Sequence, residues 1–244
     1  MKELRDRAAK AVRFFWATRK GQQEKQANSG KRDQGIRGSV TGGAQMDGFV
    51  DLVRDLLIEQ GVPETAVFQN KCVDLPGFFR PTKEWDLLVV WDGELIAAME
   101  FKSQVGPSFG NNFNNRTEEA LGSATDLWTA YREGAFNDST RPWLGYIMLL
   151  EETEKSTAPV RNKESHFNVF KEFKGSSYAK RYELFCRKLV RERLYDASCL
   201  ILSEREAGLK GSYREPSRDL AFESFVTSLI AKAVTVVKMK MLHS

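Results

Sequence analysis

Both ends of the chain carry apolar side chains at helical spacing. Residues 3–19 place them three or four positions apart among basic residues, which predicts an amphipathic helix. A second helical pattern begins at Asp47 and ends before Gly61, and a third runs over about 219–240. We assign the apolar stripe of the third segment to the core, with a subunit interface as the alternative.

Two further helices are predicted in the middle of the chain. Thr117 is followed by two glutamates, which is typical of a helix N-terminus, and this pattern ends at Gly134. Residues 177–194 predict a strongly basic helix. The Asn-rich segment from Gly110 to Asn115 precedes the first of these helices and predicts a loop.

Apolar runs without helical spacing predict the strands. A hairpin is expected over about 85–103, and single strands over 143–150 and 197–203. These strands are apolar on both faces, so helices should cover the sheet on both sides. We therefore expect one α/β domain over 1–244, with a central mixed β-sheet flanked by helices on both faces.

The chain between the first two predicted helices is polar, glycine-rich and basic. Residues 21–43 read GQQEKQANSGKRDQGIRGSVTGG, which predicts a loop, and we define the basic N-terminal arm as about 20–45. Residues 1–45 hold 11 Lys and Arg against 4 Asp and Glu, and residues 161–218 hold 14 against 8. This distribution suits a polyanionic partner, although ordinary solvated helix faces would also produce it.

Composition and motifs exclude several classes of protein. Three cysteines and two histidines are scattered without zinc-ligand spacing, and the odd cysteine count argues against a disulfide framework. The sequence contains no signal peptide and no apolar run that could span a membrane, so we expect a soluble cytoplasmic protein. It contains no GxxxxGK[ST] phosphate loop, and no GxGxxG motif follows a strand, so no nucleotide cofactor is expected.

Three charged residues interrupt the apolar hairpin. Glu100 and Lys102 are two apart on one strand and therefore share a face. A two-residue turn at Asp92–Gly93 would direct Asp86 to the opposite face from Glu100, whereas a three-residue loop would bring the two carboxylates onto one face. We expect the three-residue loop, or a bulge with the same effect, because the carboxylates can then share a divalent cation.

Asp86, Glu100 and Lys102 together have the composition of a metal-dependent phosphodiesterase site. Mg²⁺ takes oxygen ligands and is commonly held by one or two carboxylates plus a substrate phosphate. A neighbouring lysine can orient or deprotonate the attacking water and offset charge in the transition state. The alternative is a structural ion triad at the edge of a sheet.

The same residues resemble the PD-(D/E)xK nuclease motif, with Asp86 as the first acid and Glu100-Phe101-Lys102 as the ExK element. Pro81 does not directly precede the aspartate, which is a departure from that motif. The segments RPTKEWDLLVV, EFKSQVGPSFGNNFNNRTEEALG and GGAQMDGF are similar to the XhoI family of type II restriction endonucleases, over about 35–190. The resemblance implies a restriction-endonuclease-like core, Mg²⁺ held by Asp86 and Glu100, and catalysis by these two acids with Lys102.

The resemblance also implies a substrate and an assembly. It implies cleavage of the palindrome CTCGAG in double-stranded DNA by a homodimer that leaves 5′-phosphate ends. A palindrome has two-fold symmetry, which a symmetric dimer with one active site per strand would match. The alternatives are a DNA-repair or junction-resolving nuclease on the same core, and a DNA-binding protein without catalysis.

Reading bases requires side chains with paired donors and acceptors, such as Asn or Gln for adenine and Arg for guanine. The segment after Lys102 is rich in such side chains, although an Asn-rich stretch could equally supply turn conformations. The candidates for DNA binding are Arg37, Gln45, Gln104, Asn111, Asn112, Asn114, Asn115 and Arg116.

Overall fold

A five-stranded sheet lies at the centre of the fold. The computed structural model describes residues 2–28 and 43–243. The strands, in their order across the sheet, are β1 (Val67–Phe68), β4 (Leu87–Trp91), β5 (Glu94–Gln104), β6 (Trp143–Glu151) and β7 (Ala197–Ser203). The pairs β1–β4 and β4–β5 are antiparallel, whereas β5–β6 and β6–β7 are parallel. The sheet is therefore mixed, as predicted.

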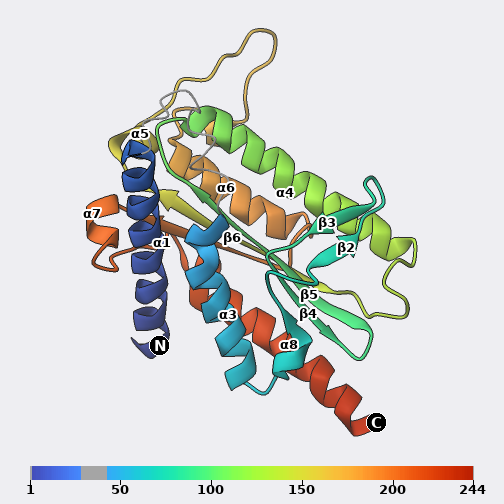
Figure 1. The fold of residues 1–244 in the computed structure, drawn as a ribbon. Coiled ribbons are helices and arrows are strands. Elements are labelled where there is room, and N and C mark those ends of the chain that lie inside the picture. The colour runs from blue at the N-terminus through green and yellow to red at the C-terminus, as the bar shows by residue number, and fades with distance from the viewer. Residues whose placement is uncertain (1, 29–42, 244) are drawn as a thin grey trace.

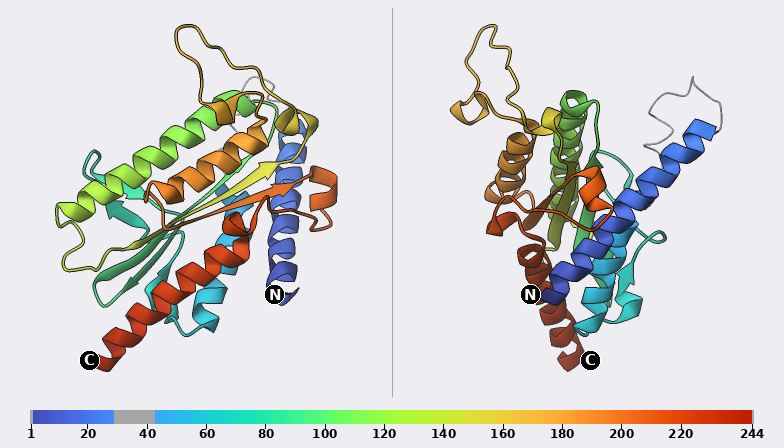
Figure 2. Two further views of the ribbon diagram at one scale, coloured as in Figure 1. Left: turned by 180° about the vertical axis from the view of Figure 1, so that it is seen from behind. Right: turned by 90° about the vertical axis from the view of Figure 1, so that its left-hand side faces the viewer.

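Helices cover both faces of this sheet (Figures 1 and 2). Within the described residues, one face carries α4 (Phe109–Arg132) and α6 (Tyr178–Arg191), and the other carries α1 (Lys2–Asn28), α3 (Asp47–Glu59) and α8 (Phe222–His243). Successive strand residues point to opposite faces. Met148 thus packs on the α4 side and Leu149 on the α1 side, and both are fully buried. The predicted fold class is confirmed.

Short elements connect these layers. They are the helices α5 (Glu154–Thr157) and α7 (Arg205–Gly208), the 3₁₀ turns η1 (Gly43–Met46), η2 (Glu64–Ala66), η3 (Lys171–Phe173) and η4 (Arg218–Leu220), and the strands β2 (Asp74–Pro76) and β3 (Thr82–Glu84). The strands β2 and β3 form a separate antiparallel hairpin that sequence reasoning did not predict. In the described part of the chain, no helix has the length and apolar character needed to cross a membrane.

Helix α1 is longer than its apolar pattern predicts. It continues to Asn28, so residues 21–28 are helical and the prediction of a loop there is wrong. The apolar stripe that revealed the helix ends near residue 19, but Gln, Glu, Lys and Ala are good helix formers that can extend an existing helix. The rest of the expected arm includes residues 29–42, which lie outside the described residues.

Helix α4 begins at Phe109 and not at Thr117, so the Asn-rich segment forms helix and its prediction as a loop is wrong. Phe109 is buried and stacks on Tyr178 with ring centroids 5.9 Å apart, which holds the first turn in place. The hydroxyl of Thr117 donates to the carbonyl of Phe113 over 2.9 Å, one turn earlier, and caps nothing. Packing here overrides the weak helix propensity of asparagine.

Candidate active site

The turn between β4 and β5 decides which side chains face each other. Asp92 and Gly93 have φ angles of 50° and 70°, as the two central residues of a type I′ hairpin turn require. Trp91 accordingly pairs with Glu94. The predicted three-residue loop is therefore wrong.

A β-bulge restores the predicted arrangement of the acids. The register shifts by one residue between Val89 and Val90, which leaves Ile96 as an extra residue in β5. On the other side of the bulge Leu87 pairs with Met99, so Asp86, the residue before Leu87, lies opposite Glu100. Both acids lie on the face that α4 covers. The alternative prediction of a bulge is confirmed.

Lys102 lies between the two carboxylates. Its Nζ is 3.6 Å from Oδ2 of Asp86 and 3.8 Å from Oε1 of Glu100. The backbone N–H of Phe101 donates to Oδ2 of Asp86 over 2.7 Å and fixes the orientation of that carboxylate. The structure thus brings together all three residues that the sequence proposes for catalysis.

The carboxylate of Glu100 is buried, with 3% of its side chain exposed. Its Oε1 forms an ion pair with Lys83, whose ammonium group also lies 4.1 Å from the centre of the Trp85 ring. Its Oε2 is buried and has no hydrogen-bond partner. A buried carboxylate oxygen without a partner is unfavourable, so this atom is positioned to accept a ligand.

Lys83 is a part of the site that sequence reasoning missed. Its only signal was a lysine two positions before Trp85 in the segment KEWD, in a hairpin that the sequence pattern did not reveal. With 12% of its side chain exposed, Lys83 is well shielded from water. It therefore supplies a fixed positive charge beside Glu100.

Lys102 carries a proton in this environment. Burial disfavours its ammonium form, but the charges of Glu100 and Asp86 outweigh burial and raise the pKa of Lys102 above its ordinary value. Removing a proton from Lys102 therefore requires that the negative charge of the two carboxylates be offset first.

The donor atoms suit a hard divalent cation. Asp86 and Glu100 offer carboxylate oxygens, and the unpartnered Oε2 of Glu100 is the atom most in need of a cation. Among residues 2–28 and 43–243, no three His, Cys, Asp or Glu side chains are grouped closely enough to hold a metal. Mg²⁺ held by Asp86 and Glu100 would keep further coordination positions for water and phosphate, as is usual for this ion.

A cleft of about 1100 Å³ opens beside these residues. Its walls come from the start of α3, the end of β5 and the first turns of α4. Asp47 and Asp51 lie on the α3 wall, and burial together with the charges of Asp51 and Asp86 raises the pKa of Asp47. The amide of Gln69 donates to Asp51 over 3.0 Å and holds it in place. Sequence reasoning assigned Asp47 only to the start of a helix and missed its place in the cleft.

The predicted DNA-binding residues occupy different positions. Gln45, Asn112, Asn115 and Arg116 line the cleft, and Oε1 of Gln45 is buried without a partner. Asn111 and Asn114 are exposed and do not line it. Arg37 lies outside the described residues.

Gln104 is buried in the protein, which its sequence position did not reveal. It accepts a hydrogen bond from the hydroxyl of Tyr182, and its amide donates to the carbonyl of Phe109 over 2.9 Å. Both ends of its side chain are thus used to join β5 to α6 and α4. Gln104 also lines the cleft, so its contact with DNA stays a prediction.

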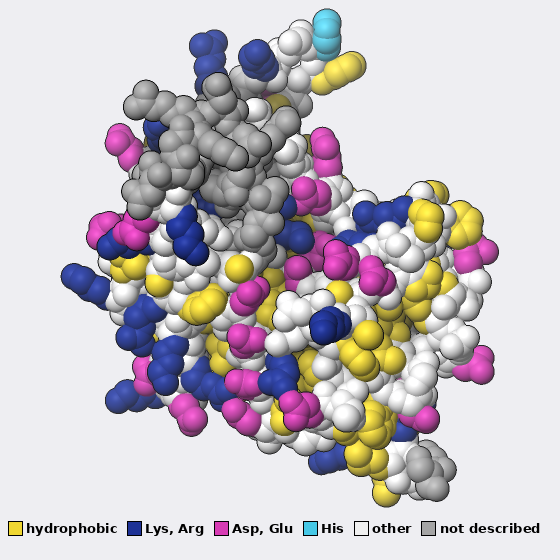
Figure 3. All heavy atoms as spheres, in the orientation of Figure 1, with side chains coloured by type: hydrophobic (Ala, Val, Ile, Leu, Met, Phe, Trp, Pro, Cys, Tyr) yellow, Lys and Arg dark blue, Asp and Glu magenta, His cyan; other side chains and the backbone are white. Residues whose placement is uncertain are grey.

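The surface around the site carries both signs of charge (Figure 3). Acidic side chains gather toward the middle of the face that Figure 1 shows, between α3 and the β2–β3 hairpin, while Lys and Arg side chains follow α1. Carboxylates at the centre would repel a phosphate unless a cation offsets them. The basic residues beside them would attract the same polyanion.

Comparison with known proteins identifies relatives along most of the chain. The family model for restriction endonuclease XhoI matches residues 25–215. The type II restriction enzyme BstVI of Geobacillus stearothermophilus is 56% identical over 212 residues, which cover 85% of this chain and 94% of that enzyme. The type II restriction enzyme XhoI of Xanthomonas vasicola is 48% identical over 189 residues, covering 76% of this chain and 75% of that enzyme.

A third relative, the type II restriction enzyme AbrI of Azospirillum brasilense, is 52% identical over 162 residues, covering 66% of this chain and 72% of that enzyme. No solved structure matches the chain. The family match includes Asp86, Glu100 and Lys102, as well as the acids of the α3 wall. The chain belongs to the restriction endonuclease XhoI family.

Proposed function

We propose that the chain is a type II restriction endonuclease that hydrolyses one phosphodiester bond in each strand of the palindrome CTCGAG and leaves 5′-phosphate ends. The observation that carries this proposal is the convergence of Asp86, Glu100 and Lys102 in a chain of this family. The names of its relatives support the same reaction class, because BstVI, XhoI and AbrI are each called a type II restriction enzyme.

Asp86 and Glu100 would hold Mg²⁺, which when bound supplies positive charge that polarises the phosphodiester and acidifies water. Glu100 presents its unpartnered Oε2, and the N–H of Phe101 keeps the carboxylate of Asp86 turned toward the site. Lys102 holds a proton at Nζ and can orient the attacking water by hydrogen bonding. If the charge of the two carboxylates were offset, Lys102 would release its own proton to solvent more readily, and the neutral amine could then accept the proton of the attacking water.

DNA would enter the cleft between α3 and the first turns of α4. Asn112, Asn115 and Arg116 lie on that wall and carry the donors and acceptors needed to read bases. Gln45 faces the same cleft with a free carbonyl oxygen. The exposed Asn111 and Asn114, with Arg37 of the basic arm, would then contact DNA outside the cleft.

A homodimer is the assembly that matches the symmetry of this substrate. The two strands of CTCGAG are related by a two-fold axis, and two copies of one active site related by the same axis can cut both strands. Basic residues outside the cleft would supply contacts to the phosphate backbone, which contribute much of the affinity for DNA.

Plasmid cleavage tests this function. A plasmid with one CTCGAG site should be linearised in the presence of Mg²⁺ and left intact with a chelator, and a plasmid in which one base pair of that site is changed should stay intact. End-labelling of the product should show 5′-phosphates. Nicks at branched or distorted DNA alone would indicate a junction-resolving nuclease, and DNA binding without any cleavage would indicate a regulator.

A further inference from the structure

Two exposed aromatic rings form the tip of the β2–β3 hairpin. The tip is the segment 77–81, which reads GFFRP, and Phe78 and Phe79 are 54% and 71% exposed. Their rings meet edge to face with centroids 5.4 Å apart. Two adjacent exposed rings form a contiguous apolar patch, and such patches often mark a site of interaction.

A buried carboxylate on α4 holds this tip in one conformation. Oδ1 of Asp126 accepts hydrogen bonds from the N–H groups of Phe78 and Phe79 over 2.8 and 2.7 Å, and Oδ2 accepts one from Nε of Arg80 over 2.7 Å. Only 5% of the Asp126 side chain is exposed. Burial opposes its ionisation, but these hydrogen bonds outweigh burial and lower the pKa of Asp126.

Gly77 makes this anchoring possible. A Cβ atom at this position would lie 2.3 Å from Oδ2 of Asp126 and 2.8 Å from the carbonyl oxygen of Arg80. Any other residue would therefore push the carboxylate away from the tip. The tip is thus a rigid support that presents two rings, and not a loose turn.

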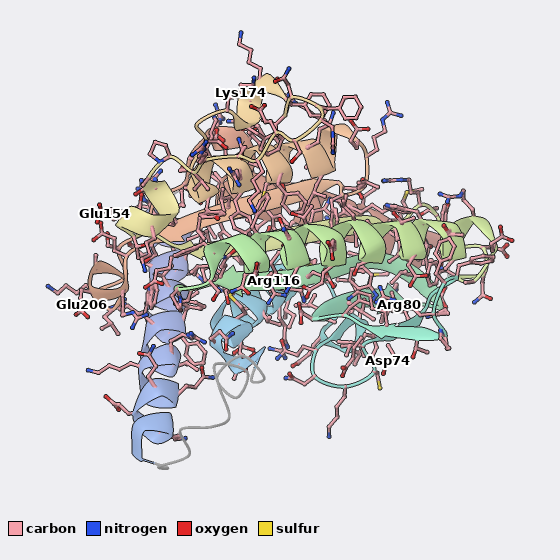
Figure 4. The ribbon with its side chains drawn as sticks, turned by 90° about the horizontal axis from the view of Figure 1, so that it is seen from above. Asp74, Arg80, Arg116, Glu154, Lys174 and Glu206 are labelled. Atoms are coloured by element: carbon pink, nitrogen blue, oxygen red, sulfur yellow. The ribbon has the colours of Figure 1, made fainter. Side chains whose placement is uncertain are left out.

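The tip lies directly beside the candidate active site. A groove of about 780 Å³ is lined by Phe79 and Arg80 at one end and by Glu100 and Lys102 further along. Figure 4 shows Arg80 between the hairpin and α4. Strand β3 also leads from the tip to Asp86 within a few residues. Phe79 therefore borders the same groove as Glu100 and Lys102, and Phe78 lies next to it at the tip.

We propose that Phe78 and Phe79 contact the bases of the bound DNA beside the phosphodiester that is cut, and that they stack on a base step which opens there. This proposal rests on the proposed function. Aromatic side chains stack on any base, and apolar wedges can insert between base pairs of a duplex. The basic side chains of Arg80, Lys83 and Arg116 border the same groove, each paired with one of its carboxylates, and would have to share that pairing with the adjacent phosphates.

A second copy of this chain is a poorer occupant for the tip. The two rings together expose on the order of 250 Å². A stable protein interface needs about 800 Å² from each partner, several times more than the tip offers. A single base step, by contrast, presents a surface of about the size of the two rings.

The test compares Phe78→Ala/Phe79→Ala with the control Phe167→Ala/Phe170→Ala. The control removes two rings that are 89% and 79% exposed but that line none of the cavities beside the site. A duplex with CTCGAG carries 2-aminopurine at one position at a time, within and beside the site, and Ca²⁺ replaces Mg²⁺ to limit cleavage. Unstacking of the probe raises its fluorescence.

The parent chain should raise the fluorescence at a position next to the cut, and the control should behave like the parent. Phe78→Ala/Phe79→Ala should lose that rise and bind the duplex about tenfold or more weakly, while its melting temperature stays within a few degrees of the parent's because both rings are exposed. Phe78→Leu/Phe79→Leu should also lose affinity and part of the fluorescence rise, but less than the alanine variant, because leucine can still act as an apolar wedge but has no ring to stack.

Other results separate the possible failures. If the parent cuts CTCGAG while the alanine variant binds within twofold and keeps the fluorescence rise, the tip proposal is wrong and the proposed function stands. If the alanine variant binds weakly but the parent raises fluorescence at no position, the rings touch the backbone and not the bases, and base stacking is wrong. If the parent neither cuts nor binds the duplex, both proposals fall.

Discussion

Asp86 and Glu100 have different surroundings, although the proposed reaction uses both as metal ligands. Asp86 is 39% exposed in its side chain and accepts a backbone hydrogen bond, whereas Glu100 is 3% exposed and paired with Lys83. Asp86→Ala or Glu100→Ala should abolish cleavage at saturating Mg²⁺. Binding to CTCGAG without metal should persist or tighten, because one carboxylate fewer repels the phosphates.

Gel-shift assays with a chelator would measure binding, and a plasmid assay with Mg²⁺ would measure cleavage. Far-UV circular dichroism serves as the control for folding. Cleavage by either variant at close to the parent's rate would show that the residue is not a metal ligand.

Lys102 can act by its charge or by moving a proton, and Lys102→Arg separates these roles. Arginine keeps the positive charge beside Asp86 and Glu100, but its planar guanidinium is larger and does not lose its proton. We expect a loss of roughly a hundredfold or more in the chemical step, as for a lost general base. Single-turnover cleavage with enzyme in excess isolates that step from binding. A rate within about tenfold of the parent's would indicate a purely electrostatic role.

Lys83 neutralises Glu100 in the absence of metal, so its removal should make stability depend on Mg²⁺. Lys83→Met leaves the buried Glu100 with only the more distant Lys102, 3.8 Å away, which should destabilise the protein by up to about 3 kcal/mol, or roughly 6–12 °C in melting temperature. Mg²⁺ bound to Glu100 would offset the same charge. The melting temperature should therefore rise more with added Mg²⁺ in this variant than in the parent.

Lys188→Met is the matched control for Lys83→Met. Lys188 pairs with Glu192 on the surface, with 69% and 54% of the two side chains exposed, and such pairs contribute little to stability. An equal effect of Mg²⁺ on the parent and both variants would mean that the cation does not bind next to Glu100.

At the scale of elements, the sequence predicts what periodicity can report. The apolar runs around Leu149 and Leu200 and the helical stripe of α3 required no tertiary information, and each lies close to its predicted place. The beginning of α4 did require it, because Phe109 holds an Asn-rich turn against Tyr178, a residue far away in the sequence. Local propensity contains no information about such a partner.

The candidate site shows the same limit. The spacing of Glu100 and Lys102 fixes their shared face, since side chains alternate along a strand. Whether Asp86 shares that face depends on the bulge at Ile96, the extra residue of β5. No local sequence pattern indicates that a bulge occurs there. Lys83 could not be found at all, because its hairpin consists of two three-residue strands whose alternation is too short to recognise.

The β2–β3 hairpin offers a test of how its tip is held. Gly77→Ala should displace the carboxylate of Asp126 and weaken its hydrogen bonds to the tip, which should lower the free energy of unfolding by about 1–3 kcal/mol. Gly122→Ala in α4 is the control, because a Cβ there meets nothing within 4 Å and alanine favours a helix by up to about 1 kcal/mol. Urea denaturation measures the free energy of unfolding of both variants. A Gly77→Ala variant as stable as the parent chain would show that Asp126 does not anchor the tip.

At the scale of the whole molecule, the proposal requires two copies of one active site on one duplex, and mixed dimers test this directly. Parent and Asp86→Ala chains with different affinity tags, co-expressed and purified by both tags in turn, give dimers with one competent site. Such a dimer should bind CTCGAG through both halves but cut only one strand, because each site reaches the phosphodiester of its own half. It should convert supercoiled plasmid to the open circle and form little linear DNA.

Parent dimers should linearise the plasmid, and dimers of Asp86→Ala should leave it supercoiled. If the mixed preparation instead forms linear DNA at about half the parent's rate, with no build-up of open circles, one active site cuts both strands and the symmetric dimer is wrong.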